Sequence, residues 1–430
     1  MDLTTEQKDI TAAAREFAEK EFRDRAKEFD EKEEFDLSIV KRAAENGFIG
    51  VFIKEEYGGA GLGFLEHSLI TEEMWRVDPG CGQNICSAGF GAEMIQTFGT
   101  EEQKRTYLPM IASGEVIIGT AITEPDAGSD VTLVKTRAQK KGDRYVIDGA
   151  KMFITNGCNA RYLLVYAVTD PEAKDVHKRC SIILLDTTSP GFTATKIRGK
   201  MGIRASNTAE VSFSNVEVPV ANLIGKEGRG FYQLMEFFNM TRNHVAAQGV
   251  GVAQGALEMA ISHVKKRKAF GGSLSRLQGV QFKLAEMATR VEAARSLYWR
   301  AAYLLDNGRL DPALVSMAKW FAGETAVYVV NEALQLHGGY GYCSDYPVER
   351  HYRIRYPEVL PRRKDRGDLR RLQGGRKSGH CKRAPEKGFL DHTFRILGRH
   401  CLLRIHPFRE TAVHPVIVAT HVWFPGGNHR

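Results

Sequence analysis

The stretch GTAITEPDAGSD, residues 119–130, stands where the chain changes from one pattern to another. Before it, apolar residues recur at helical spacing, and after it short apolar runs alternate with turn residues. Gly128 and Ser129 predict a turn with exposed backbone N–H groups, to which Thr123 and Ser129 add hydroxyls. Such a turn can cradle a phosphate or the polar edge of a heteroaromatic ring. An ordinary acidic turn is the alternative.

The run KMFITNG, residues 151–157, belongs to one of the strands that follow. Side chains alternate with period two along a strand, so Phe153 and Thr155 are predicted on the same side. An aromatic ring beside a hydroxyl suits a flat cofactor. A half-buried pair on an ordinary strand is the alternative.

Helical patterns flank the strands on both sides. Thr4 or Thr5 is predicted to cap the first helix, and Thr100 with Gln103 forms a capping box further on. After the strands come three long helical segments, at 231–270, 277–308 and 312–339. The order predicts an α+β chain with an N-terminal helical domain, a central small β-barrel-like domain and a C-terminal helical bundle. The expected boundaries are 1–115, 116–228 and 229–353.

Composition is that of an ordinary globular protein, with 43% hydrophobic and 26% charged residues. No run approaches the roughly 18–20 apolar residues of a membrane span, and no signal peptide is predicted at the N-terminus. Seven cysteines without a CxxC pair argue against a disulfide framework and a zinc site, so no metal is expected. A reducing compartment is expected, and we predict cytoplasmic localisation, with an organelle matrix as the alternative.

The segment RKAFGGSLSRLQ, residues 267–278, joins two of the long helices through a basic, glycine-rich corner. It could take a pyrophosphate, or it could be only a turn. From the residues alone, both interpretations remain open.

Five segments together resemble, in order, signatures of the acyl-CoA dehydrogenase family. They are ITEPDAGSD (122–130), KMFITNG (151–157), FNMTRNHVAAQGVGVAQGALE (238–258), RKAFGGSLSRLQGVQFKLAEM (267–287) and ALQLHGGYGYCSDYPVER (333–350). The resemblance spans about residues 1–353. It implies a homotetrameric flavoprotein with one FAD per subunit, lying between the β domain and the helices.

The resemblance also implies roles for individual residues. Ile122, Thr123 and Ser129 would contact the isoalloxazine ring or its edge, and Gly128 would make the turn. Phe153 and Thr155 would flank the flavin from the next strand.

Further residues would reach a different part of the cofactor. Arg267, Phe270 and Gln278 would contact the FAD pyrophosphate and adenosine of a neighbouring subunit, and Gln335 and Gly339 belong to the same wall. On the substrate side, the resemblance implies Ser129 and Arg242, the latter at the position of a CoA-side arginine.

The implied reaction is α,β-dehydrogenation of an acyl-CoA thioester. A carboxylate removes the α-proton while the flavin accepts a β-hydride, and hydrogen bonds to the thioester oxygen stabilise the developing enolate. Electrons would then pass to electron-transferring flavoprotein.

One part of the family pattern is missing. In most of the family the base is the glutamate of a Y-E-G-T segment that follows PVER-x-YRDA. Here PVERHYR occupies 347–353, the pattern then stops, and no YEG occurs anywhere. A second family solution places a glutamate directly before the arginine of the TR pair, where this chain has Thr241. The catalytic residues therefore stay unknown.

The composition breaks at the same point. From Ile354 to the end there are 17 Lys or Arg and 6 Asp or Glu, so this stretch carries +11 and the preceding 353 residues carry −3. GDLRR (367–371) can be encoded by codons that read E-I-Y-E-G one nucleotide later. Its neighbours PRRKDR (361–366) and HCKR (380–383) can likewise be read as R-A-E-R-I-G and T-A-R. We hypothesise that 354–430 is an out-of-frame translation, with the base hidden under Arg370–Arg371.

A different class of function would be an inactive flavoprotein scaffold with a basic, nucleic-acid-binding tail. The tail contains no recognisable binding motif and no sustained basic helical face. We therefore expect no nucleic-acid partner.

Overall fold

The computed structural model describes residues 2–354. The basic tail, and with it the hypothesis of a frame-shifted segment, lies outside the described residues from position 355 on. Within the described range, no helix is long and apolar enough to cross a membrane.

The N-terminal part of the chain is helical. Thr4 caps the first helix in a capping box with Gln7, and Thr100 does the same with Gln103, which confirms both capping predictions. The helices are α1 (Thr5–Phe22), α2 (Ala26–Lys32), α3 (Ser38–Glu45), α4 (Phe64–Val77), α5 (Pro79–Cys86), α6 (Ala92–Phe98) and α7 (Glu101–Ala112).

An eight-stranded sheet follows, in the strand order β6-β7-β3-β2-β4-β5-β8, with β1 pairing parallel to β4. Along β4, Leu163 and Val165 face one apolar cluster while Leu164 and Tyr166 face another, as period-two alternation requires. The second cluster includes residues of α6, α7 and α8, so this face of the sheet packs against helices. The strands are β1 (Ile118–Ala121), β2 (Arg137–Lys141), β3 (Arg144–Thr155), β4 (Tyr162–Val168), β5 (Cys180–Asp186), β6 (Phe192–Lys196), β7 (Thr208–Pro219) and β8 (Leu223–Ile224).

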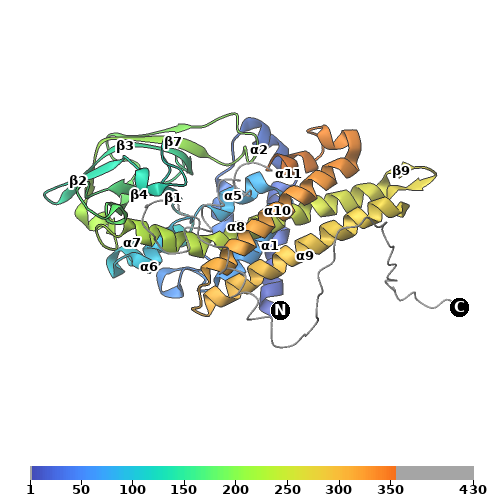
Figure 1. The fold of residues 1–430 in the computed structure, drawn as a ribbon, viewed down its shortest axis with the longest axis horizontal. Helices are drawn as coiled ribbons and strands as arrows, with labels where there is room; N and C mark the ends of the chain where they lie inside the picture. Colours follow the sequence, from blue (N-terminus) through green and yellow to red (C-terminus); the bar gives the residue numbers. More distant parts are fainter. Residues whose placement is uncertain (1, 355–430) are drawn as a thin grey trace, which may run out of the picture. The chain divides into compact units, whose positions relative to one another are not determined.

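Long helices return after the sheet (Figure 1). They are α8 (Gly230–Lys266), α9 (Gln278–Asp306) and α10 (Pro312–His337), with the short α11 (Val348–Arg353) at the end. A small hairpin of β9 (Lys268–Ala269) and β10 (Gly272–Ser273) joins α8 to α9. Helices, sheet and helices in this order confirm the predicted α+β fold class.

Helix α8 crosses α4 so closely that two of its positions have room only for glycine. A Cβ at Gly251 would lie 2.4 Å from the carbonyl oxygen of Glu72, and one at Gly255 would lie 2.1 Å from that of Arg76. Any larger residue would push the two helices apart.

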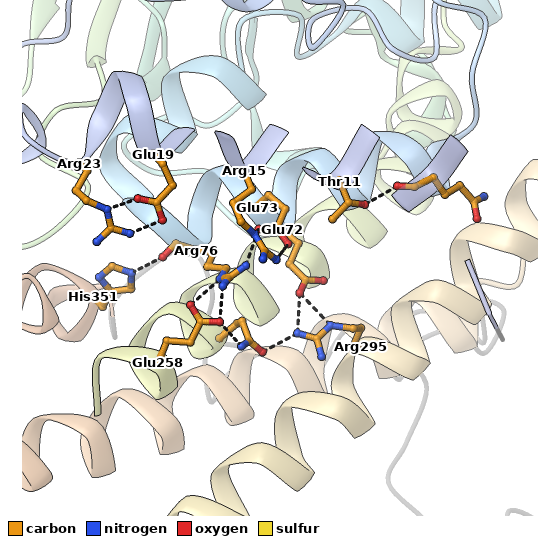
Figure 2. A network of polar contacts seen from close by, with 12 residues as sticks. Thr11, Arg15, Glu19, Arg23, Glu72, Glu73, Arg76, Glu258, Arg295 and His351 are labelled. Atoms are coloured by element: carbon orange, nitrogen blue, oxygen red, sulfur yellow. Dashed lines mark hydrogen bonds and ion pairs between the residues drawn. The ribbon is translucent and has the colours of Figure 1, made fainter. Parts of the chain in front are cut away.

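Charged side chains tie the same helices together (Figure 2). On α4, Glu72 accepts two hydrogen bonds from Arg295 of α9, at 2.9 and 2.7 Å. Its neighbour Glu73 accepts from Arg15 of α1, and Arg76 bridges Glu73 to Glu258 of α8. This set of ion pairs is called the helical network below.

Candidate functional site

The turn that follows β1 carries the predicted cofactor residues Ile122, Thr123, Gly128 and Ser129. The backbone of Glu124 and Ala127 pairs in both directions, at 2.9 and 3.2 Å, and this closes a tight loop. Gly128 and Ser129 are exposed just beyond it, whereas Ile122 is buried in the apolar cluster beneath. The loop thus presents polar groups above an apolar base.

Strand β3 brings Phe153 and Thr155 beside this turn. The N–H of Met152 donates to the carbonyl of Thr123 at 2.8 Å. A Cβ at Gly119, in the strand β1 that leads into the turn, would lie 2.9 Å from the carbonyl oxygen of Thr155. Ile122, Thr123, Phe153 and Thr155 therefore belong to one edge of the β domain, which we call the turn edge together with Gly128 and Ser129.

Phe153 departs from the regular strand that the sequence predicts. Its φ is +61°, in the left-handed region that bulky side chains avoid, and the pairing with β7 shifts between Lys151 and Ile154. The ring is 62% exposed, while Ile154 is buried and Thr155 is half-buried. The backbone irregularity presents an aromatic ring to the outside of the turn edge.

A second group of predicted residues gathers at the far end of α8. Arg267, Gln335 and Gly339 line a pocket of about 490 Å³ together with His263, Leu274, Leu336, His337, Gly338, Tyr340 and Cys343. The Arg267 guanidinium carbon lies 5.6 Å from the centre of the Tyr340 ring. Phe270, at the tip of the β9–β10 hairpin, is 91% exposed with a φ of +50°. Gln278 is the exposed first residue of α9.

These two groups lie far apart in one chain. Met240 of α8 packs in the same apolar cluster as Ile122 of the turn edge, whereas Arg267 caps the C-terminal end of that helix. At a rise of 1.5 Å per residue, Met240 and Arg267 lie about 40 Å apart along the helix. Arg242 stands at the first end, half-buried, and donates to the Asn239 side chain at 2.7 Å.

Family models match the chain in three consecutive stretches that follow this architecture. The model of the acyl-CoA dehydrogenase N-terminal domain covers residues 4–115, that of the middle domain 119–216, and that of the C-terminal domain 228–355. The chain belongs to the acyl-CoA dehydrogenase family.

Individual proteins agree with this membership. An acyl-CoA dehydrogenase of Bacillus subtilis (strain 168) is 41% identical over 351 residues, which cover 81% of this chain and 92% of the relative. A solved structure described as the electron transferring flavoprotein of Acidaminococcus fermentans superposes with a TM-score of 0.83 at 41% identity, covering 87% and 99%. A glutaryl-CoA dehydrogenase of Mycobacterium smegmatis in complex with FADH2 gives 0.77 at 29% identity, covering 82% and 89%.

At the turn edge, this acyl-CoA dehydrogenase-family chain has two further residues that the sequence motifs do not predict as part of the site. Lys151 is fully buried, and its Nζ donates to the carbonyl of Ile122 at 3.0 Å and to Glu124 Oε1 at 2.9 Å. Glu124 is 5% exposed. Both stand inside the quoted motifs, but a charged residue in a strand or turn is ordinarily solvated, so their burial has no signal in the sequence.

A third missed group is the carboxyl of Glu93 in α6. It is 4% exposed and its Oε2 accepts from the Gly91 N–H at 3.0 Å. Burial raises its pKa to about 7. The side chain lines a cavity of about 10 Å³ with Phe48, Ile49, Gly50, Phe52, His67, Ile85, Cys86, Gly89 and Phe90. Burial also lowers the pKa of His67 to about 4, so both groups are neutral between these values.

The described residues supply no carboxylate at the helical position where some family members carry their base. Thr241 occupies it, buried, with its hydroxyl donating to the Phe237 carbonyl at 2.9 Å. The other family position would follow α11, outside residues 2–354.

Proposed function

We propose that this acyl-CoA dehydrogenase-family protein binds FAD and converts an acyl-CoA thioester to the enoyl-CoA. The observation that carries the proposal is the turn edge, where polar turn residues and the exposed Phe153 ring come together over an apolar base. A similar solved structure holds the reduced form of the same cofactor.

The residues present fit FAD in both groups. At the turn edge, the half-buried Thr155 and the exposed Phe153 offer a hydroxyl and an aromatic surface for a flat ring with one polar edge. The pocket at the far end of α8 that Arg267 lines is called the distal pocket here. Its Arg267 offers a cation for a pyrophosphate. A Cβ at Gly338 or Gly339 would meet nothing within 4 Å, so the backbone there is open to a ligand.

The distance along α8 supports a site shared between subunits. About 40 Å exceeds the length of an extended FAD, so one molecule cannot reach both groups of the same chain. We therefore assign Arg267, Phe270, Gln278, Gln335 and Gly339 to the cofactor of a neighbouring copy. Large apolar side chains are exposed on α9, α10 and the turn after it, which favours an assembly; they are Phe282, Tyr303, Met317, Trp320 and Tyr342. We propose the homotetramer that the family resemblance implies.

The chain's own residues would then act as follows. Bound FAD supplies the acceptor for the hydride that leaves the β-carbon. Arg242 offers a guanidinium to the phosphates of CoA, and Ser129 stands at the turn edge toward the substrate. Ile122 and the apolar cluster beneath it exclude water from this edge. Electron-transferring flavoprotein is the proposed oxidant, in keeping with the A. fermentans structure described above.

Removal of the α-proton needs a carboxylate as the base. In the family this carboxylate stands either at the position of Thr241 or in a segment that would lie beyond residue 354. We propose that a reading-frame change has removed the second. On this proposal the chain as written binds FAD but turns over acyl-CoA slowly. The alternative, an inactive scaffold with a nucleic-acid-binding tail, concerns residues outside the described range, and nothing in residues 2–354 favours it.

Cysteine chemistry supports a reducing location. Cys81, Cys86, Cys158, Cys180 and Cys343 are all free thiols. Because disulfides are rare in reducing compartments, we propose that the protein acts in the cytoplasm.

The test compares two full-length chains loaded with FAD. One is the chain as written, and the other has the reading frame restored so that the region of 367–371 reads E-I-Y-E-G. Both receive acyl-CoAs of different chain length and an artificial electron acceptor. The restored chain is expected to oxidise at least one of them, and the chain as written to be slower by about 10²–10⁴-fold, the usual contribution of a general base. Failure of the FAD-loaded restored chain on every acyl-CoA would refute the proposed reaction.

A further inference from the structure

The turn edge rests on the most deeply buried cation of the described chain. Lys151 is 0% exposed, and among residues 2–354 no other lysine or arginine is buried to this degree. Its ammonium makes two hydrogen bonds, to the Ile122 carbonyl at 3.0 Å and to Glu124 Oε1 at 2.9 Å. Nζ also lies 5.9 Å from the centre of the Tyr166 ring.

Glu124 also accepts hydrogen bonds from the far end of the loop that begins at this residue. Its Oε1 accepts from the Thr136 N–H at 2.9 Å, and its Oε2 accepts from the Lys135 N–H at 2.6 Å. Residues 125–134, which include Gly128 and Ser129, therefore leave from Glu124 and return to it. One carboxylate fixes both ends of the loop.

Neighbouring strand contacts complete the arrangement. Ile122 is held through its carbonyl by Lys151, and Thr123 is held through its carbonyl by the Met152 N–H at 2.8 Å. Two consecutive residues of KMFITNG thus fix two consecutive residues of the turn. Phe153 follows directly, with its left-handed backbone.

A gain in folding stability does not explain why a buried ion pair stands at this position. Removing a lysine and a carboxylate from water costs several kcal/mol per ion, and buried pairs can often be replaced by apolar residues without loss. What an apolar pair could not do is hold the Ile122 carbonyl and the two N–H groups at the loop base in one geometry. A fixed geometry is what a bound cofactor requires.

We infer that Lys151 and Glu124 form a positioning pair for the flavin: Lys151 sets the backbone at Ile122, and Glu124 sets the loop that carries Gly128 and Ser129. The inference rests on the proposed binding of FAD. Neither residue is assigned a chemical step.

The test uses the full chain, stripped of FAD and titrated with it again. Lys151→Met alone leaves Glu124 buried without its partner and can fail to fold. The decisive variant is therefore Lys151→Met/Glu124→Gln, which removes both charges and keeps an amide at the loop base. Arg144→Met is the matched control, because it deletes an exposed ion pair with Glu217 from β3, the strand that carries Lys151.

Two quantities are measured beside thermal unfolding: the dissociation constant of FAD and the reduction potential of the bound flavin. The double variant is expected to unfold as the parent does, to bind FAD on the order of tenfold more weakly, and to show a shifted potential. Arg144→Met is expected to change neither. Parent-like affinity and potential in the folded double variant would overturn the positioning role while leaving the proposed function standing.

A third measurement does not depend on the cofactor. Amide hydrogen exchange at Met152, Lys135 and Thr136 reports directly whether the loop base opens. These amides are expected to exchange faster in the double variant than in the parent without FAD. Unchanged exchange would contradict the inference even if the parent bound no FAD, an outcome that would by itself refute the proposed function.

Discussion

Buried charge is used differently in the helices and at the turn edge. In the helical network, Glu72 and Glu73 each face an arginine from another helix (Figure 2). Several members keep contact with water, as Arg15 does at 46% side-chain exposure. At the turn edge a single pair, Lys151 and Glu124, stands at 0% and 5% exposure. The network joins side chains of different helices to one another, whereas Lys151 and Glu124 make most of their hydrogen bonds to backbone groups.

The difference shows what each arrangement can hold. A network shared among α1, α4, α8 and α9 fixes helices relative to one another, and its loss would affect the whole bundle. The pair at the turn edge fixes a few backbone groups next to the proposed flavin. We therefore expect mutations in the network to lower the free energy of unfolding, and mutations of the pair to act mainly on cofactor binding.

The largest expected effect is that of Arg295→Met. It leaves the buried Glu72 without its cation, with only the Tyr298 hydroxyl still donating to it. The free energy of unfolding should fall by about 3–5 kcal/mol, measured by urea denaturation. Arg23→Met is the matched control, because its pair with Glu19 is exposed and should be worth about 1 kcal/mol or less. Equal losses in the two variants would remove the distinction between buried and exposed members.

Glu93 sharpens the comparison as a buried carboxyl that has no cation among the ion pairs of residues 2–354. Its pKa is raised from 4.5 to about 7, so the fold favours the neutral form. The stability that this provides is complete below pH 4.5 and is lost as the pH rises to about 7. Ionisation at pH 8 then costs about 3 kcal/mol, at roughly 1.4 kcal/mol per unit of pKa.

Glu93→Gln is accordingly expected to stabilise the protein at pH 8 by up to about 3 kcal/mol and to change little at pH 4.5. Unfolding by urea at the two pH values measures both numbers. A gain in stability that does not depend on pH would show that the variant differs from the parent in packing and not in ionisation.

A smaller effect on stability is expected when both charges of the turn edge are removed. Lys151→Met/Glu124→Gln should unfold within about 1.5 kcal/mol of the parent, because the desolvation cost disappears with the pair. Lys151→Met alone should cost more than the double variant, since it leaves Glu124 uncompensated. If the double variant were the less stable of the two, the pair would be a structural element like the helical network.

The smallest effect is that of Phe153→Gly, and its sign is opposite for folding and binding. Glycine accepts a φ of +61° without strain, so the free energy of unfolding should stay level or rise by about 1 kcal/mol. The affinity for FAD should fall because the exposed ring is gone. Phe153→Ala separates the causes, since it removes the ring but keeps the strain. FAD titration of both variants decides whether the ring or the backbone matters.

Much of the fold follows from local patterns in the chain. Thr4 and Thr100 cap their helices through contacts three residues away, and β4 alternates between two apolar clusters with period two. Such features depend on neighbours in sequence, which is why they could be predicted. The order of helices, strands and helices was predicted for the same reason.

The site is predictable only in part. The grouping of Ile122, Thr123, Phe153 and Thr155 in one site follows from the resemblance of their segments to the family's signatures, and not from either motif alone. Burial of Lys151 does not, because it depends on Glu124 lying 27 positions earlier in the chain and on the sheet that covers both. Likewise Glu93 looks like a solvated helix residue, and only the packing of α6 shows that it is buried. The left-handed backbone of Phe153 has no signal in a run that otherwise favours a strand.

The central claim is that the turn edge and the distal pocket of a second copy together bind FAD. The most direct measurement is the FAD content of the purified full chain after incubation with excess cofactor and removal of the unbound fraction. We predict one FAD per chain, held by an oligomer. Homogeneous, folded protein that retains no FAD would contradict it.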